Sequence, residues 1–337
     1  WRARWAGQQS ELARLQAAQD VVRTAADTRK AWIRAVAAGQ TAQYMRDVKE
    51  AAEAGAELAR RMARVGNWSK LQQAREQALL ADATAQLARA EQAALASREQ
   101  LTRLMGLWGA QAQYALPQRL PALPEALPAS TDVEARALRE RLDVRAAQLE
   151  ARFVAQSLGY TRATGFINAL DIGYGRNTTF NNANGERETK KGWEVELPLP
   201  VFDWGQGRNA RAEGTYLQSV ARVRAVAVQA RSEAREAWHG WRTAHDLALH
   251  YRDEIVPLRK FINDEVVLRY NGMLASVWDL LGDVRMNIAA VNSSIDAQRD
   301  FWLADTDLQL VLTGTSPGGL SALQAGAPAT SSEAKGH

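Results

Sequence analysis

The feature of this sequence that most restricts its fold is a run of apolar residues, spaced alternately three and four positions apart, across residues 216–262. A sustained period of 3.5 residues is typical of coiled coils. At about 1.5 Å of rise per residue, the run predicts a helix of roughly 70 Å, which is too long for a compact domain. Pro257 should kink or restart this helix without changing the apolar register. The run consists of Tyr216, Val220, Val223, Ala227, Ala230, Ala234, Ala237, Trp241, Ala244, Ala248, Tyr251, Ile255, Leu258 and Ile262.

Two other segments carry the same spacing. Alanine fills many of the expected seam positions, which lets neighbouring helices approach closely, while Arg, Glu and Gln fill much of the remainder. These segments predict further long helices, and by themselves they leave open a cytoskeletal or scaffold coiled coil. The seam positions are Leu71, Ala74, Ala78, Ala81, Ala85, Ala88 and Leu95 in one segment, and Val277, Leu281, Val284, Ile288, Val291 and Ile295 in the other.

An internal repeat argues against a generic coiled coil. The stretch "RKAWIRA" at 29–35 matches "REAWHGW" at 235–241, which places Trp32 over Trp238, 206 residues apart. The stretch "RVGNWSKL" at 64–71 matches "YNGMLASV" at 270–277, which places Gly66 over Gly272 at the same offset. The chain is therefore predicted to contain two copies of a long helical hairpin, with each glycine at the bend.

One segment has the alternation of a strand. In "KKGWEVELPLPVFDW" at 190–204, apolar residues fall on one side, while Glu194, Glu196 and two prolines fall on the other. Residues 166–180 form a plausible first strand, and "NNANGERETKK" is expected to be the polar turn between them. An apolar outer face and a polar inner face suit a membrane barrel to which several copies contribute, and a hairpin packed on a soluble domain is the alternative. The apolar, lipid-facing residues of this strand are Trp193, Val195, Leu197, Leu199 and Val201.

The predicted fold is mainly α with a small β part. It consists of duplicated coiled-coil hairpins and a β-hairpin that contributes to a trimeric transmembrane barrel. The expected segments are a first hairpin at 1–108, a Pro-rich connector at 109–131, a helix at 132–165, the β-hairpin at 166–204, a second hairpin at 205–312 and a disordered tail at 313–337. The repeat offset sets Trp1 opposite Gly207, so a counterpart of "GWEVELPLPVFDW" is expected before residue 1.

Composition excludes several function classes. The net charge is +4, but basic and acidic residues alternate along the chain, and no nucleic-acid reader motif is present. The absence of cysteine removes disulfides and thiolate metal sites. His239, His245 and His250 are spaced by six and five residues, so they do not share a helix face as metal ligands would. With no phosphate loop or nucleophile motif, the sequence predicts neither an enzyme nor a cofactor.

Four stretches together resemble the TolC-type outer membrane efflux factor family. "ELPLPVFDWGQGRNARA" (196–212) resembles the family's strand-to-helix junction, and "RLDVRAA" (141–147) resembles its Arg-Pro-Asp-Leu box, with Leu142 where proline is usual. "RVGNWSKLQQAREQ" (64–77) and "RYNGMLASVWDLL" (269–281) resemble the two tips of the family's periplasmic tunnel. The order and spacing of the four stretches carry the resemblance over nearly the whole chain.

The resemblance implies a homotrimer whose strands close one twelve-stranded barrel in outer membrane lipid, continued by a helical tunnel across the periplasm. It implies passive conduction of drugs or metal ions that are delivered by a periplasmic adaptor and an inner-membrane pump. An acidic ring formed by Asp279 and Asp283 would gate the tunnel entrance. A periplasmic coiled-coil scaffold without a pore remains the alternative. The residues that would dock the adaptor are Val65, Gly66, Asn67, Asn271, Gly272 and Met273.

Overall fold

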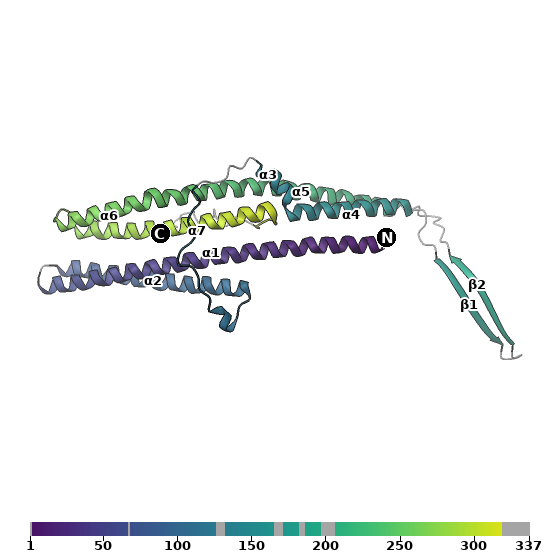
Figure 1. Cartoon of the computed structure of the whole chain (residues 1–337), viewed down its shortest axis with the longest axis horizontal. Coiled ribbons are helices and arrows are strands. Elements are labelled where there is room, and N and C mark those ends of the chain that lie inside the picture. Colours follow the sequence, from purple (N-terminus) through teal and green to yellow (C-terminus); the bar gives the residue numbers. More distant parts are fainter. Residues whose placement is uncertain are drawn as a thin grey trace, which may run out of the picture. The chain divides into compact units, whose positions relative to one another are not determined.

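The computed structural model describes residues 2–66, 68–125, 132–164, 171–181, 186–196 and 206–318, most of which are helical (Figure 1). The mainly helical fold predicted from the sequence is confirmed. Within the described ranges, none of the helices combines the length and the apolar character of a membrane span. The elements are α1 (Arg2–Arg64), α2 (Lys70–Met105), a 3-10 turn η1 (Gly109–Ala112), α3 (Val133–Glu140), α4 (Leu142–Thr164), β1 (Asp171–Asn181), β2 (Glu186–Glu196), α5 (Gln206–His250), a π-helical turn η2 (Tyr251–Ile255), α6 (Val256–Asn271) and α7 (Val277–Thr313).

The chain divides into two compact units, each made of two stretches of sequence. The first unit comprises Trp1–Gln16 and Asp143–Gln229, and the second comprises Ala17–Leu142 and Ala230–His337. The boundaries between the units fall inside α1 and α5, so each of these long helices contributes to both units.

The first unit contains an antiparallel ribbon of β1 and β2. Tyr174 lies opposite Trp193 and Ile172 lies opposite Val195, so these four positions share one face of the ribbon. The expected polar turn is wrong, because β2 already begins at Glu186. Polar residues complete a backbone ladder as well as apolar ones do, so the change from polar to apolar residues did not mark the start of the strand.

The second unit has its core between α5 and α7. Alanines of α5 allow close approach, and the aromatic rings of Trp241 and Phe301 stack with centroids 6.3 Å apart. Smaller clusters join α1 to α7 and α1 to α2. The main cluster consists of Leu123, Ala137, Ala234, Ala237, Trp241, Ala248, Ala297, Phe301, Ala304, Leu308, Val311 and Leu312.

The predicted seam of α5 is buried at Ala230, Ala234, Ala237, Trp241 and Ala248. It does not continue unchanged, because the π-helical turn η2 adds a residue to the helical repeat and rotates the following face. Consequently Leu258 is 58% exposed, and the expectation that the register survives Pro257 is wrong at that position. Pro257 lies directly after η2, and the wider π-helical turn accommodates a residue that has no N–H to donate.

The predicted seam of α2 does not face the rest of the chain. Its seven residues are all exposed, whereas Glu76, Leu79, Ala83, Leu101 and Thr102 are the residues that α2 buries. The heptad spacing identified an apolar stripe, but it could not tell which face of an alanine-rich helix meets its own chain. In α7, by contrast, the predicted seam is half-buried from Leu281 to Val291 and buried at Ile295.

The connector after α2 is held by hydrogen bonds to its backbone carbonyls. The Pro121 carbonyl accepts from Gln298 Nε2 at 2.8 Å and from Trp302 Nε1 at 3.2 Å. The Pro124 carbonyl lies 2.9 Å from Nε2 of the buried His245. An extended segment has no ladder of its own, so these side chains supply partners that its backbone needs. Leu120 and Leu123 fill the core beneath it.

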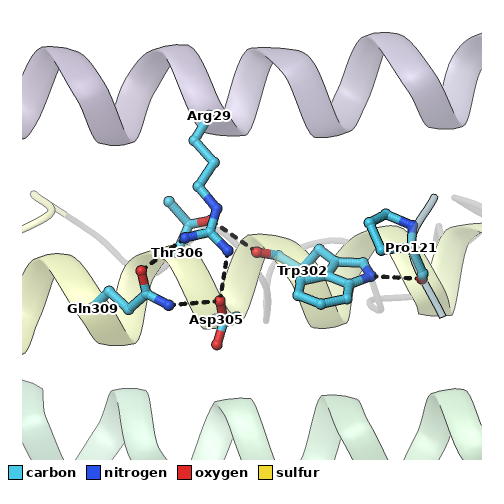
Figure 2. A network of polar contacts seen from close by, with 6 residues as sticks. All are labelled: Arg29, Pro121, Trp302, Asp305, Thr306 and Gln309. Atoms are coloured by element: carbon cyan, nitrogen blue, oxygen red, sulfur yellow. Dashed lines mark hydrogen bonds and ion pairs between the residues drawn. The ribbon is translucent and has the colours of Figure 1, made fainter. Parts of the chain in front are cut away.

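Polar contacts join α1 to α7 beside the connector (Figure 2). Arg29 donates to Gln309 Oε1 at 2.7 Å and to Asp305 Oδ2 at 3.0 Å, and Gln309 donates to the same carboxylate oxygen at 2.9 Å. One residue along, Lys30 forms a buried ion pair with Asp307. These charged contacts fix the register of the two helices.

A buried arginine secures the junction between α3 and α4. The Arg141 side chain is 1% exposed, and its Nη2 lies 2.6 Å from a carboxylate oxygen of Glu233 on α5. Ser316 donates to the other oxygen of Glu233 at 2.6 Å, and the Leu142 N–H donates to the Gly314 carbonyl at 3.0 Å. The junction therefore links the middle of the chain to the end of α7.

Replacing Arg141 by methionine should lower the free energy of unfolding of the second unit by about 3 kcal/mol, because it breaks the ion pair of the buried Arg141 with Glu233. Chemical denaturation followed by circular dichroism measures the change. Arg136→Met is the matched control, since Arg136 forms an exposed ion pair with Glu140, and the variant should cost about 0.5 kcal/mol or less. Equal losses for the two variants would contradict the assigned role of Arg141.

Candidate functional site: the hairpin tips and the acids beside them

The first hairpin turns at residues 65–69. The Gly66 N–H donates to Ala63 O at 3.2 Å and the Trp68 N–H donates to Met62 O at 3.3 Å, which closes the end of α1. Gly66 has φ of 79°, a left-handed conformation in which glycine has no steric penalty. Val65 is 68% exposed at this turn. Asn67, a predicted docking residue, lies outside the described residues.

The second hairpin turns differently at residues 272–276. The Gly272 N–H donates to Leu268 O at 3.0 Å and the Leu274 N–H donates to Arg269 O at 2.8 Å. Gly272 has φ of −80°, and the left-handed residue is Met273, with φ of 60°. Asn271, also a predicted docking residue, is the last residue of α6. Met273 is 92% exposed, so this tip presents a large apolar side chain to solvent.

Both returning helices begin with a serine cap. Ser69 Oγ accepts from the Gln72 N–H at 3.2 Å, and Ser276 Oγ accepts from the Asp279 N–H at 3.2 Å. The side chain of the third helical residue returns the bond in each case, which completes a capping box. The cap serines are 207 residues apart, one more than the glycines, because the serine follows the glycine by three residues at the first tip and by four at the second.

Asp279 is thus the capping-box residue of α7. Its Oδ2 accepts from the Ser276 N–H at 3.0 Å and from Ser276 Oγ at 2.8 Å. These hydrogen bonds hold the pKa of the Asp279 carboxyl below its usual value. The ionised form also suits the positive end of the helix dipole.

Two buried acids lie seven residues after the two cap serines. Asp283, predicted as a gate residue, is 8% exposed, and its Oδ2 has no hydrogen-bond partner among the described residues. Its counterpart in the first repeat is Glu76, which is 7% exposed, and burial raises the pKa of its carboxyl. A Cβ added at Gly55 would lie 3.2 Å from Glu76 Oε2, so the Glu76 side chain lies against the α1 backbone at that glycine.

Sequence reasoning missed Glu76 and Tyr270. Burial, and then the charge of Glu76, raises the pKa of the Tyr270 hydroxyl, so the two side chains interact across α2 and α6. The signal that could have found Glu76 is its spacing of 207 residues from Asp283. Nearby, Arg285 of α7 lies 3.0 Å from Asp82 of α2, which joins the two returning helices.

Solved structures of bacterial membrane proteins share this fold. A membrane protein from Pseudomonas aeruginosa superposes with a TM-score of 0.80 and 21% identity, over 95% of this chain and 72% of that chain. The Campylobacter jejuni CmeC outer membrane channel superposes with a TM-score of 0.78 and 16% identity, over 94% of this chain and 68% of that chain. The outer membrane protein VceC from Vibrio cholerae superposes with a TM-score of 0.69 and 19% identity, over 91% of this chain and 73% of that chain. No protein-family profile and no curated protein sequence matches the chain.

The chain has the fold of the TolC-type outer membrane efflux channels. The resemblance inferred from the sequence is confirmed at the level of the fold. Of the residues expected to face lipid in a TolC-type barrel, Trp193 and Val195 lie in β2, opposite Tyr174 and Ile172. Leu197, Leu199 and Val201 lie outside the described residues.

The two capping boxes of this TolC-type fold predict a difference in response to pH. The folded state lowers the pKa of Asp279, so its stabilising effect is fully present above its ordinary pKa of about 3.8 and is lost as the pH falls through the lower folded-state value. Gln72 does not titrate in this range. Acidification below pH 3.8 should therefore speed amide exchange in the first turn of α7 relative to the first turn of α2.

Hydrogen exchange followed by mass spectrometry compares residues 277–280 with residues 70–73 in the same sample. In the Asp279→Asn variant, amide exchange in the first turn of α7 should depend on pH no more strongly than amide exchange in the first turn of α2. An equal acid response of the two turns in the unmodified chain would contradict the assignment.

Proposed function

We propose that this chain is the outer membrane component of a tripartite efflux system, conducting substrates passively from the periplasm to the exterior. The support is the fold, which the chain shares with the CmeC and MtrE outer membrane channels. In this role the protein makes and breaks no bond, and it needs no cofactor. The inner-membrane pump selects the substrate, whether drugs or metal ions, because a wide tube discriminates little.

The observation that carries the assembly of several copies is the apolar stripe on α2, from Leu71 to Leu95, whose seven residues are all exposed in a single chain. A stripe at heptad spacing is the surface that a helix uses to pack against another helix. Along most of its length the stripe is alanine, which permits close approach of a second helix. A partner helix outside the single chain is therefore required to cover it.

The internal repeat indicates which surface covers the stripe. In the second repeat the position equivalent to Ala74 is Leu281, which packs against Ala52, Leu79 and Ala83 of the first repeat. The first repeat therefore forms a socket, and a helix of the second repeat fills it.

The equivalent surface on the second repeat is partly open. Its positions are Arg259, Met286 and Ala290, each shifted by 207 residues from the first socket, since η2 adds one residue before Arg259. Met286 is 55% exposed, whereas Ala290 is 8% exposed. We infer that Ala74 and its stripe on one copy pack against the exposed Met286 side of this surface on the next copy, as Leu281 packs on the first repeat within the chain.

An interface between unlike surfaces continues from copy to copy until a rotation closes the ring. With two hairpins per copy, three copies give a closed tube of six hairpins, which is the homotrimer expected for this fold. Among the described residues β1 and β2 pair only with each other, so both edges of the ribbon are available to further strands of a trimeric barrel. The protein is then located in the outer membrane, with Trp193 and Val195 facing lipid, and extends into the periplasm.

Ala81→Glu should break the assembly, because it introduces a charge in the centre of the stripe. Mass measurement in detergent should give a trimer for the unmodified chain and a monomer for the variant. Ala93→Glu is the matched control, since Ala93 is an exposed alanine of α2 outside the stripe, and this variant should stay trimeric. A monomeric unmodified chain, or a trimeric Ala81→Glu variant, would overturn the interface.

The tips dock the helical hairpin of the periplasmic adaptor in this proposal. Val65, Met273 and Leu274 expose 68%, 92% and 82% of their surface, so both turns carry unsatisfied apolar area. Gly66, Asn271 and Gly272 shape the turns so that these side chains project, and Asn67, outside the described residues, is proposed as a further docking residue. Apolar anchors inserted into a partner groove are a frequent means by which small surfaces bind firmly.

The acids beside the tips form the gate. Three copies bring together three Asp283 and three Glu76 side chains, with Asp279 at the start of each α7. A ring of carboxylates concentrates negative potential and favours cations. Burial of Asp283 and Glu76 in the single chain suits a closed entrance, because buried carboxylates become solvated only when the helices part.

Channel recordings test conduction and the gate together. Trimers in planar bilayers should conduct with a preference for cations, and Asp283→Asn should reduce the ratio of cation to anion permeability about twofold or more. Asp264→Asn, at an exposed position on α6, is the control and should leave the ratio unchanged. Trimers that never conduct would refute the channel, whereas conduction with an unchanged ratio would refute only the gate.

A periplasmic scaffold without a pore is the alternative function. A scaffold could use the same α2 stripe to assemble, so the stripe does not distinguish a scaffold from a channel. The need for detergent does distinguish them. A scaffold remains soluble as an oligomer without detergent, whereas a barrel with a lipid-facing ribbon needs detergent or lipid.

A further inference from the structure

Met273, in the turn between α6 and α7, is both strained and exposed (Figure 1). Its φ of 60° is left-handed, and in the part of the chain that the structure describes it is the sole residue other than glycine with a positive φ. A side chain in this conformation carries a steric cost that glycine does not. Met273 gains little packing in return, because 92% of its surface is exposed.

The first tip shows that the turn does not require a methionine. Shifted by 207 residues, Met273 corresponds to Gly66, which has φ of 79°. Each of these residues lies three positions before the serine that caps the returning helix, Ser276 and Ser69 respectively. The turn therefore needs the left-handed backbone and not the thioether. A strained residue that stands where a glycine would serve indicates a use for its side chain.

The five methionines of the chain differ in their access to solvent. Met45 is 2% exposed, Met62 is half-buried and Met105 is 37% exposed. Met286 is 55% exposed, and its Sδ accepts a hydrogen bond from an arginine of α6 at 3.5 Å. Oxidation of a thioether requires the sulfur lone pair to meet an oxidant from solution, so the reaction follows exposure. Met273 is therefore the methionine that an oxidant reaches first.

We propose that Met273 is an oxidation site, at which a peroxide converts the thioether to a sulfoxide and thereby weakens docking of the adaptor at the second tip. The sulfur lone pair attacks one peroxide oxygen, so that an S–O bond forms as the O–O bond breaks. The departing hydroxide takes the proton from the transferred oxygen and leaves as water. The sulfur is oxidised by two electrons and the peroxide is reduced by two.

The sulfoxide changes the chemistry of one tip only. A thioether is apolar, whereas a sulfoxide oxygen is a hydrogen-bond acceptor that must lose its water when it enters an apolar groove. Val65, at the first tip, carries no sulfur and is unaffected. Methionine sulfoxide reductases, with a thiol as the reductant, restore the thioether, so the change is reversible. The effect on docking rests on the proposed function, whereas the oxidation itself does not.

Peptide mass spectrometry tests the site. The folded chain in detergent is treated with hydrogen peroxide for increasing times, and the fraction that has gained one oxygen is measured at each methionine. Met273 should be oxidised about tenfold or more faster than Met45, and faster than Met286, because exposure sets the rate. The buried Met45 also reports any unfolding. Equal rates at Met273 and Met45 in the folded chain would overturn the proposal.

The effect on docking is measured with the periplasmic adaptor that cross-links to this chain in cells. The chain is oxidised alone and freed of peroxide before the adaptor is added, so that only one partner is modified. Adaptor binding, followed by surface plasmon resonance, should weaken about fivefold or more, because the sulfoxide must be dehydrated on docking. Oxidation should have the same effect in Met105→Leu, which removes an exposed methionine outside the tips. In Met273→Leu, peroxide should leave the affinity unchanged, whatever its value before treatment.

Undiminished binding by the oxidised chain, or an equal loss of binding in Met273→Leu, would overturn the effect on docking. Failure of the unoxidised chain to bind the adaptor would refute the proposed docking function, and this effect with it. The oxidation rates decide separately whether Met273 is the oxidation site.

Discussion

The structure of the second unit depends on burial of α7. This helix supplies side chains to the main cluster with α5, to the cluster with α1, and through Leu281 to the small cluster with α2. Because three surfaces of one helix must be buried at once, its sequence is apolar at many positions. Asp305 meets Arg29 and Asp307 meets Lys30, so the charges on α7 select the register in which the apolar surfaces fit.

The repeat explains both what the two hairpins share and where they differ. Each returning helix starts with a serine cap, and each buries an acid seven residues later. The differences are small in sequence: Gln72 stands where the second tip has Asp279, and a glycine takes the left-handed position that Met273 takes in the second tip. The two copies of the hairpin therefore differ in whether the residue that completes the capping box can titrate.

Much of the fold could be predicted from the sequence because long periodic runs and repeated landmarks are strong signals. The helical hairpins, the bends at Gly66 and Gly272, the strand pair and the seam of α5 all rest on such signals. The exposed side of α2 could not be predicted, since heptad spacing does not distinguish a partner in the same chain from one in another copy. Glu76 was missed because a single acid in an alanine-rich helix looks like surface, and only its buried environment distinguishes it.

The π-helical turn η2 has a mechanical consequence. From Trp32 to Gly66, the first hairpin's outgoing arm is α1 alone, an unbroken α-helix up to Arg64, while the matching arm from Trp238 to Gly272 is interrupted at Tyr251–Ile255. A π-helical turn breaks the regular α-helical ladder, so the hydrogen-bond pattern of the second arm changes there. We therefore expect a twist applied to the second arm at Gly272 to be taken up near Tyr251, whereas the first arm has no such break between Trp32 and Arg64.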